Sequence, residues 1–453
     1  MNPAVPPVGS PAGAPSLRPL LTAVFRTWRE SGIRFVVLRN YQQLPDSTSN
    51  DVDVLVAPCA LAEAERRLIT AASQAGYRPH QRVCFDPVSL FFHHPQTLHQ
   101  VQIDLFHRLA WRGVPLLDTE SVLDRSVQRD LFAVPDPVDE AVLNLLIRLL
   151  YQGRVREKYR ESIRTVAGER SEAFFARLAE AVGTKAARTL AEWTRGGDWE
   201  AIESRAHRWR RNVVCRALFH APGRVLRAWA SDLKRLWARA RRPPGLLVVL
   251  LGPDGCGKST VARLLFPALS PTFQPDKSLL GHWKPEVLPL PHRRGRPPTT
   301  QPHGRASRGR WLSLIVLFLH ALEYGLAHWC VIQPVRFRNG WVVMDRYHHD
   351  FFVDPRRYRL APPPLLFLRM FRMVSDPDLV FVLDAPVEVL RRRKTEVPEE
   401  ETRRQRQAYL ELACRLPKAH VLDATQPAPL LVQQIVRIVL GHLAGRRTRS
   451  PWT

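Results

Sequence analysis

Residues Leu246–Thr260 read LLVVLLGPDGCGKST, an apolar run that passes directly into a glycine-rich turn. The apolar run predicts a buried parallel strand, and the following VARLLFPAL predicts an amphipathic helix. Gly252 and Gly257 bracket the turn, and Lys258 and Ser259 complete it. Strand, turn and helix in this order are typical of a phosphate-binding loop.

Each residue type in this loop has a chemical task. Glycines let backbone amides surround a phosphate, the Lys258 ammonium reaches the β- and γ-phosphate oxygens, and the Ser259 hydroxyl ligates magnesium. ATP and Mg²⁺ are therefore the expected cofactors. The predicted nucleotide-binding residues of the loop are Gly252, Pro253, Asp254, Gly255, Cys256, Gly257, Lys258, Ser259 and Thr260.

The composition is that of a folded, multidomain and strongly basic chain. Its 453 residues are 45% hydrophobic, enough for two or three domains with sizeable cores. Lys and Arg number 67 against 42 Asp and Glu, which gives a net charge of +25. This charge predicts an anionic partner, such as a nucleotide, a nucleic acid, a phosphorylated glycan or an acidic lipid surface, without choosing among them.

The six cysteines form no CxxC pair, which argues against a zinc site and a disulfide framework and favours a reducing, cytoplasmic location. Residues 1–16 lack a basic segment followed by an apolar core, so we expect a disordered leader and no signal peptide. Trp311–Ile332 is about long enough to cross a bilayer, but Glu323 lies near its middle, so a buried helix is favoured over a span. Peripheral membrane contact stays open.

Composition divides the rest of the chain. Residues 17–138 alternate short helical and strand patterns and predict a small α/β domain, residues 139–244 predict a helical connector, and residues 446–453 form a basic tail. Residues 245–445 contain four apolar runs that end in polar residues, LLVVLLG, WVVMDRY, DLVFVLDA and HVLDA. Alternating with helices, they predict a doubly wound parallel sheet with its chemistry at the carboxyl ends of the strands. The long segment 270–310 is predicted to be an irregular insert that recognises the acceptor.

Two charged segments complete the predicted catalytic set. Asp345 and Arg346 end the second of these strands, where Asp345 would hold magnesium or orient the acceptor and Arg346 would face phosphate. The alternative for Asp345 is a helix cap. Arg391, Arg392 and Arg393 lie on a charged helix before a hinge and predict a mobile lid that neutralises the transferring phosphoryl group, although a solvated charged helix has the same pattern.

Together, GPDGCGKST, WVVMDRY, PDLVFVLDAPVEVLRRRK and HVLDATQP resemble the thymidylate kinase family over roughly residues 245–445. The resemblance implies that Asp345 and Arg346 contact acceptor and phosphate, and that the final loop, Asp423–Gln426 with Ala424 and Thr425, cradles adenine. It also implies that Arg391–Arg393 supply the lid arginine, because Asp254 stands where a loop arginine would.

The chain also differs from the thymidylate kinase pattern at two places. Tyr324 replaces a phosphate-binding helix arginine, and Gly281-His282-Trp283-Lys284-Pro285 replaces the family's acceptor loop. MDRYHHDFFVDPRRYR, with HWKP and QPH at 301–303 upstream, is similar to thymidylate-kinase-like proteins found with bacterial surface-polysaccharide genes. That similarity implies a phosphorylated sugar, glycolipid or related anion as acceptor. The predicted substrate residues are His282, Trp283, Lys284, Tyr324 and Tyr347.

Asp51 and Asp53 in NDVDVLV lie on one face of a predicted strand, and Asp104 in VQIDLF adds a third acid from a neighbouring strand. Three such acids would hold two magnesium ions for nucleotidyl transfer, and the pattern is similar to the minimal nucleotidyltransferase fold. Leu38-Arg39-Asn40 stands where that fold has a Gly-Ser turn. An active transferase, a degenerate binding domain and simple solvated acids all stay open.

The sequence thus predicts an ATP-dependent kinase acting on an anionic small molecule or a lipid-linked acceptor. The alternatives are a thymidine monophosphate kinase and a nucleotide-switched binding or scaffold protein. Nucleic acid is not the expected partner, and a homodimer stays open.

Overall fold

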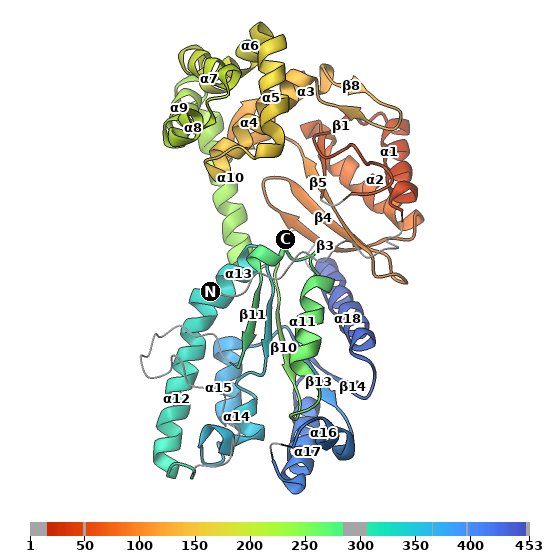
Figure 1. Ribbon diagram of the computed structural model, residues 1–453, viewed down its shortest axis with the longest axis vertical. Coiled ribbons are helices and arrows are strands. Elements are labelled where there is room, and N and C mark those ends of the chain that lie inside the picture. The colour runs from red at the N-terminus through yellow and green to blue at the C-terminus, as the bar shows by residue number, and fades with distance from the viewer. Residues whose placement is uncertain (1–15, 49–50, 284–305, 365, 396, 450–453) are drawn as a thin grey trace. The chain divides into compact units, whose positions relative to one another are not determined.

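The computed structural model describes residues 16–48, 51–283, 306–364, 366–395 and 397–449 (Figure 1). Its contacts divide the chain into two units, residues 1–237 with 446–453 and residues 238–445. Predictions that fall on the leader, on Lys284 and on the QPH segment at 301–303 lie outside the described residues.

The first unit is built on a mixed seven-stranded sheet of order β3-β4-β5-β2-β1-β9-β8, with a separate β6-β7 ribbon. Its strands are β1 Phe35–Val37, β2 Val52–Val56, β3 Arg78–Cys84, β4 Val88–His93, β5 Gln100–Phe106, β6 Leu109–Trp111, β7 Val114–Leu117, β8 Val127–Gln128 and β9 Ala133–Val134. Its helices are α1 Arg18–Glu30, α2 Leu61–Gln74, α3 Thr119–Asp124, α4 Pro137–Gln152, α5 Glu157–Glu169, α6 Ser171–Val182, α7 Thr184–Gly196, α8 Trp199–Ser204, α9 Ala206–His220 and α10 Pro222–Arg241, which runs on into the second unit.

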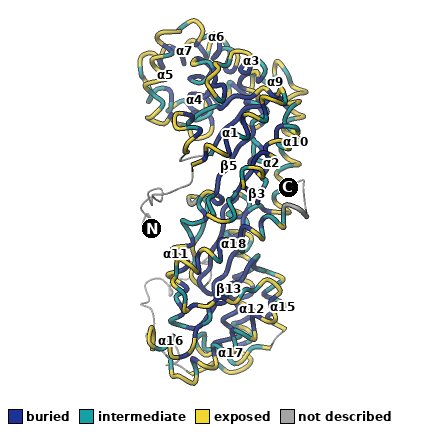
Figure 2. The backbone as a smooth tube through the Cα atoms, turned by 90° about the vertical axis from the view of Figure 1, so that its right-hand side faces the viewer, coloured by how far each residue is buried: buried dark blue, intermediate teal, exposed yellow. Residues whose placement is uncertain are grey.

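Successive side chains of β2 enter two different hydrophobic cores, one on each face of the sheet. Val54 and Val56 pack with α1 and α2, whereas Leu55 packs with Val142 and Leu146 of α4 and with the helices that follow. Successive strand residues point to opposite faces, so Asp53 shares the face of Leu55 and lies toward α4. The sheet is thereby covered by helices on both sides, and β5 is buried along most of its length (Figure 2).

The second unit is a five-stranded, all-parallel sheet of order β11-β12-β10-β13-β14. Its strands are β10 Leu247–Leu251, β11 Leu279–His282, β12 Val342–Asp345, β13 Leu379–Asp384 and β14 Ala419–Asp423. Its helices are α11 Lys258–Ala268, α12 Arg310–Ala327, α13 Gln333–Phe337, α14 Asp350–Val353, α15 Leu366–Ser375, α16 Val387–Arg393, α17 Glu399–Arg415 and α18 Ala428–Arg449, with a π-helical turn His328–Ile332 after α12.

The four strands predicted in this region are confirmed as β10, β12, β13 and β14, and the parallel sheet is confirmed. Helices α12 and α15 cover one side of the sheet and α11 and α18 the other (Figure 1). All five residues of β10 are buried, as expected for a central parallel strand. The prediction of an irregular insert over 270–310 was wrong in one respect, because Leu279–His282 forms the edge strand β11 against β12.

The predicted buried helix at 311–332 is buried on one side only. Leu317, Tyr324 and Ile332 enter the core, whereas Ile315, Phe318 and other apolar residues of α12 are exposed. Among the described residues, Arg310–Phe337 and Ala428–Arg446 are long and apolar enough to cross a membrane by length and composition, and both pass this test with only 39% of the apolar window buried.

Candidate active site

The glycine-rich loop between β10 and α11 depends on backbone conformations that favour glycine. Gly252, Gly255 and Gly257 have φ values of 140°, 85° and 92°. A Cβ at Gly252 would lie 2.5 Å from the Leu383 carbonyl oxygen of β13, and one at Gly255 would lie 2.7 Å from the Leu390 carbonyl oxygen of α16. The loop is therefore held between the end of a neighbouring strand and the helix that carries the predicted lid arginines.

Lys258 is the first residue of α11 and is buried. Its Nζ donates to the carbonyl oxygens of Gly252 at 2.8 Å and Pro253 at 2.9 Å, and lies 3.5 Å from Cys256 Sγ. The ammonium thus lies over the loop, held by two of its carbonyl oxygens and close to the Cys256 thiol. The Thr260 and Val261 amides donate to the Gly257 carbonyl oxygen at 3.1 and 3.0 Å. The amides of Lys258 and Ser259 come too early in α11 for such a bond, so this end of the helix can bind an anion.

Asp345 ends β12, which pairs in parallel with β10 and brings the carboxylate next to the loop. The Ser259 hydroxyl donates to Asp345 Oδ2, and His282 Nδ1 at the end of β11 lies 3.7 Å from the same oxygen. Burial raises the pKa of Asp345, but the close approach of His282, the charge of Lys258 and the Ser259 hydroxyl together lower it to about 2. The other oxygen, Oδ1, is buried without a hydrogen-bond partner in the described part of the chain.

Arg346 follows directly and is buried in an ion network. Its backbone has a φ of 74°, which is unusual for a side chain of this size and concentrates at functional sites. Its Nη1 donates to Asp350 Oδ2 at 2.6 Å, and its Nη2 donates to Asp254 of the loop. Arg357 also donates to Asp254 and, through Nε at 3.1 Å, to Asp354.

Asp254 therefore stands between two guanidinium groups. Burial alone would raise its pKa, but the charges of Arg346, Lys258 and Arg357 hold that pKa well below its usual range. Sequence reasoning missed Arg357 and Asp350. The only signal was their place in the segment DFFVDPRRYR, because nothing in the sequence shows that Asp350 and Asp254 flank Arg346 or that Arg357 reaches the loop.

An aromatic cluster adjoins the ends of β11 and β12. Trp283 stacks on Tyr358 with ring centroids 5.1 Å apart and meets the edge of Phe351. The Tyr324 hydroxyl donates to the Trp283 carbonyl oxygen at 2.7 Å. Tyr324 and Tyr347 pack edge to face and are fully buried, so these two predicted substrate residues lie in the core of the second unit. His282 is exposed beside Asp345.

The predicted lid lies at α16 and α17. Arg391 Nη1 donates to the Val397 carbonyl oxygen at 3.4 Å, Arg393 Nη1 donates to the Ala424 carbonyl oxygen at 2.9 Å, and Arg392 is exposed. In the loop after β14, Asp423 accepts from the Thr425 amide at 2.9 Å. The lid helix and the predicted adenine loop are thus joined through Arg393.

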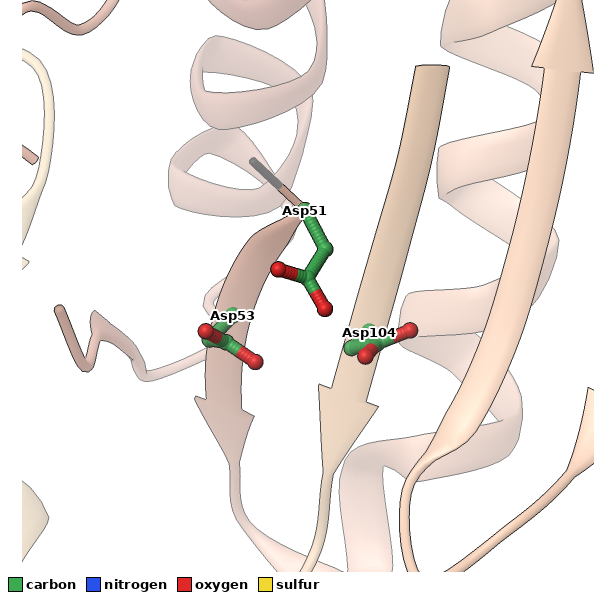
Figure 3. Close-up of side chains that lie close together, drawn as sticks. All are labelled: Asp51, Asp53 and Asp104. Carbon is green, nitrogen blue, oxygen red and sulfur yellow. The ribbon is translucent and has the colours of Figure 1, made fainter. Parts of the chain in front are cut away.

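In the first unit, the three predicted acids come together on neighbouring strands (Figure 3). Asp53 of β2 lies directly opposite Asp104 of β5, and Asp51 precedes β2. One oxygen from each of the three carboxylates lies within 4.8 Å of the others. Burial, with the charges of Asp53 and Asp51, raises the pKa of Asp104 to about 7.

Arg39, the residue predicted at the position of the missing Gly-Ser turn, lies against this cluster. Its Nε approaches Asp53 Oδ2 at 2.5 Å and its Nη2 approaches Oδ1 at 3.0 Å. Both oxygens of Asp53 are thereby engaged by a guanidinium. The cluster has a fixed cation of its own, so its net charge is less negative than that of three carboxylates alone.

The solved structures that are similar to part of this chain include two thymidylate kinases. The thymidylate kinase of Ehrlichia chaffeensis is 17% identical with a TM-score of 0.32, covering 43% of this chain and 98% of that one. The thymidylate kinase of Candida albicans is also 17% identical, with a TM-score of 0.33, covering 43% of this chain and 91% of that one. No protein-family model and no curated protein sequence matches the chain.

Proposed function

We propose that the second unit is an ATP-dependent kinase that transfers the γ-phosphoryl group to an anionic small molecule or lipid-linked acceptor. The observation that carries the proposal is the pairing of Ser259 with Asp345 beside Lys258, which leaves Asp345 Oδ1 buried and without a partner among the described residues. A buried, ionised carboxylate oxygen with no donor is costly unless a cation binds there.

The donor atoms suit magnesium. The Ser259 hydroxyl and the Asp345 carboxylate are the hard oxygen ligands that Mg²⁺ prefers, and both would hold it. Bound there, the ion would neutralise charge on the transferring phosphoryl group. Lys258 would leave the carbonyl oxygens of Gly252 and Pro253 for the phosphate oxygens, which are stronger acceptors.

The acceptor would bind where the ion network meets the aromatic cluster. Arg346 and Arg357 would bind its phosphate or carboxylate by bidentate hydrogen bonds, and Trp283 would pack on its ring. Tyr324 is buried and bonded to the Trp283 backbone, so the helix arginine of thymidylate kinases has no counterpart there. This arrangement favours a phosphorylated sugar or a lipid-linked sugar over thymidine monophosphate. Arg391, Arg392 and Arg393 would neutralise the transition state when the lid closes.

The test of nucleotide binding is Lys258→Ala, with Lys418→Ala as the matched control. Lys418 is a half-exposed lysine of the same unit that precedes β14, at the opposite end of the strands from the loop. Calorimetric affinity for ATP with magnesium should fall about a hundredfold in Lys258→Ala and stay unchanged in Lys418→Ala. Equal ATP affinity in the wild type and in Lys258→Ala would overturn the assignment.

A panel of acceptors then identifies the reaction. Sugar phosphates, lipid-linked sugars and thymidine monophosphate are incubated with ATP and magnesium, and products are detected by the mass of one added phosphoryl group. We expect products from the sugar class that disappear in Lys258→Ala. Preferential turnover of thymidine monophosphate would favour the thymidylate kinase alternative, and nucleotide binding without any product would favour the nucleotide-switched scaffold.

For the first unit, we propose a divalent cation site formed by Asp51, Asp53 and Asp104, as a nucleotidyltransferase-like domain would require. The observation that favours it is the convergence of three carboxylates from β2 and β5. Calorimetry with Mn²⁺ is done in an Asp345→Asn background, which removes the cation ligand proposed in the second unit, and should detect binding that is lost when Asp53→Asn/Asp104→Asn is added. Binding that persists in the double variant would contradict the site.

A further inference from the structure

Helix α12 carries two stripes of large side chains, one buried and one exposed. The buried stripe includes Leu317 and Tyr324, which enter the core. The exposed stripe has Trp311 at one end and Trp329 just beyond the other, 82% and 70% exposed, with Phe318 and Leu322 between them at 58% and 54%. A solvent-facing stripe of a helix is normally polar, and no other described residue covers this apolar face.

The exposed stripe follows helical periodicity. Trp311, Ile315, Phe318 and Leu322 recur at intervals of four, three and four residues, which places them along one side of α12. An 18-residue helix is about 27 Å long, so the face is an extended strip. Helix α15 packs beside α12, with Val374 close to Gly325, and has two exposed apolar residues of its own, Leu366 and Met373.

The exposed charges on α12 and in the residues that follow it to 338 are of one sign. Arg310 begins α12, Arg338 follows α13 and Arg369 lies on α15, and all three are exposed. Between residues 306 and 338 the only acidic residue is Glu323, which is buried with its carboxylate 3.6 Å from His320 Nδ1. The strip therefore combines an apolar surface with basic ends.

We propose that the exposed face of α12 lies in the headgroup region of an anionic lipid membrane. Tryptophan, phenylalanine and leucine on one side, with arginine at the margins, are the composition of helices that lie in the plane of a membrane interface. The net charge of +25 adds long-range attraction to such a surface. Because the opposite stripe belongs to the core, the helix lies on the membrane and does not cross it.

A second copy of the chain is the less suitable occupant. Packing the strip against its twin would bring basic ends together, whether the two helices ran parallel or antiparallel. Anionic lipid supplies negative charge along the whole strip. The inference does not depend on the proposed kinase activity, because neither Lys258 nor Asp345 contributes to this face.

The test is sedimentation of the full chain with vesicles of phosphatidylcholine and phosphatidylglycerol, compared with phosphatidylcholine alone. Phe318→Ser/Leu322→Ser removes apolar area without changing charge and should lower the fraction bound to anionic vesicles at least about tenfold. The matched control Leu264→Ser/Val421→Ser alters two other exposed apolar residues of the same unit and should bind as the wild type does. Lys258→Ala should also bind as the wild type does, which separates this inference from the proposed function.

Equal vesicle binding by the wild type and Phe318→Ser/Leu322→Ser would overturn the proposal, since the basic surface alone would then explain binding. If the wild type does not bind vesicles and is dimeric, while Phe318→Ser/Leu322→Ser is monomeric, the face is an interface between two copies and the proposal is overturned.

A second experiment leaves the apolar face unchanged. A fluorophore is attached to Cys330, which is exposed and follows Trp329, in a variant whose other exposed cysteines are replaced by serine. Its emission should shift to the blue with anionic vesicles, and no shift would count against the proposal. The same fluorophore on Cys414 of α17 should not shift.

Discussion

At the scale of single residues, two aspartates buried next to each other make the stability of the first unit depend on pH. Asp53 and Asp104 are both buried and face each other across β2 and β5. Arg39 compensates Asp53 directly, whereas Asp104 accepts a hydrogen bond from Gln102 at 2.9 Å. Burial and the two neighbouring acids raise the pKa of Asp104 from 3.8 to about 7, and they outweigh the hydrogen bond from Gln102, which lowers this pKa. Asp104 thus retains its proton at a pH where an ordinary aspartate has lost it.

This raised pKa predicts a pH-dependent effect of Asp104→Asn on stability. As the pH rises from about 4 to about 7, the unfolded chain has released the proton that the folded chain still holds, so the unfolding free energy of the wild type falls. The fall is at most about 1.4 kcal/mol per pH unit. Asn cannot ionise, so the stability of Asp104→Asn relative to the wild type should increase over this interval, as measured by urea unfolding in a chelator near pH 5 and near pH 7.

Asp130→Asn is the matched control for this measurement, because Asp130 is an exposed aspartate of the same unit. Its effect on the unfolding free energy should be the same at both pH values. An Asp104→Asn effect that is equally independent of pH would show that the folded and unfolded chains protonate this carboxyl alike.

The meeting of Asp51, Asp53 and Asp104 could be predicted from the sequence, because strand alternation and the pairing of two acid-bearing strands follow from local pattern. The position of Arg39 could not. It depends on the antiparallel pairing of β1 with β2, which brings the residue after Leu38 to Asp53. Arg357 was missed for the same reason, since its contact with Asp254 joins residues 103 apart in sequence.

At the scale of secondary-structure elements, the glycine-rich loop between β10 and α11 is in direct contact with α16. Gly255 approaches the Leu390 carbonyl oxygen so closely that a Cβ would lie 2.7 Å away, whereas a Cβ at Gly257 would meet nothing within 4 Å. Both glycines have positive φ values, 85° and 92°. An alanine at either position would have to adopt an unfavourable positive φ, but only an alanine at Gly255 would also clash with a neighbouring atom.

Alanine substitutions at these glycines separate the two effects. Gly257→Ala should lower the unfolding free energy of the second unit by about 1 kcal/mol, the cost of a left-handed conformation. Gly255→Ala should cost at least about 1 kcal/mol more, because it also forces α16 away from the loop. Thermal unfolding without nucleotide is the measurement, and equal losses for both variants would contradict the packing of the loop against α16.

Elements of the second unit could be predicted unequally well. Apolar runs such as LVVLL and LVFVLD are long enough to identify β10 and β13. The strand β11 has four residues, LLGH, of which two are exposed, and it leads into a proline-rich stretch. Only its pairing with β12 shows that it is a strand, and this pairing places His282 opposite Asp345.

At the scale of the whole molecule, the two units have separate cores. The clusters around α1, α2 and α4 belong to the first unit, and the cluster around β10, β12 and β13 belongs to the second. Unfolding of such a chain need not be two-state. A ligand that binds one folded unit stabilises that unit by mass action.

Calorimetry should therefore resolve two thermal transitions, only one of which responds to ATP with magnesium. At a ligand concentration a hundred times the Kd, the gain is about 2.7 kcal/mol, or an increase of about 5 °C or more in the Tm of the second unit. Lys258→Ala should keep both transitions and lose the response to ATP. A single transition, or a shift of both, would show that the units unfold together.

The double engagement of Asp254 has a consequence for selectivity. With no acceptor bound, Arg346 and Arg357 are already neutralised by a carboxylate, so an arriving compound must compete with an internal anion before it gains anything. A singly charged molecule would replace one carboxylate by another single negative charge and gain little binding free energy. A dianionic phosphate monoester has one more negative charge and would be attracted more strongly to the two guanidinium groups. In the proposed kinase, acceptors would thus be discriminated by the charge of their phosphate before the rest of the molecule makes contact.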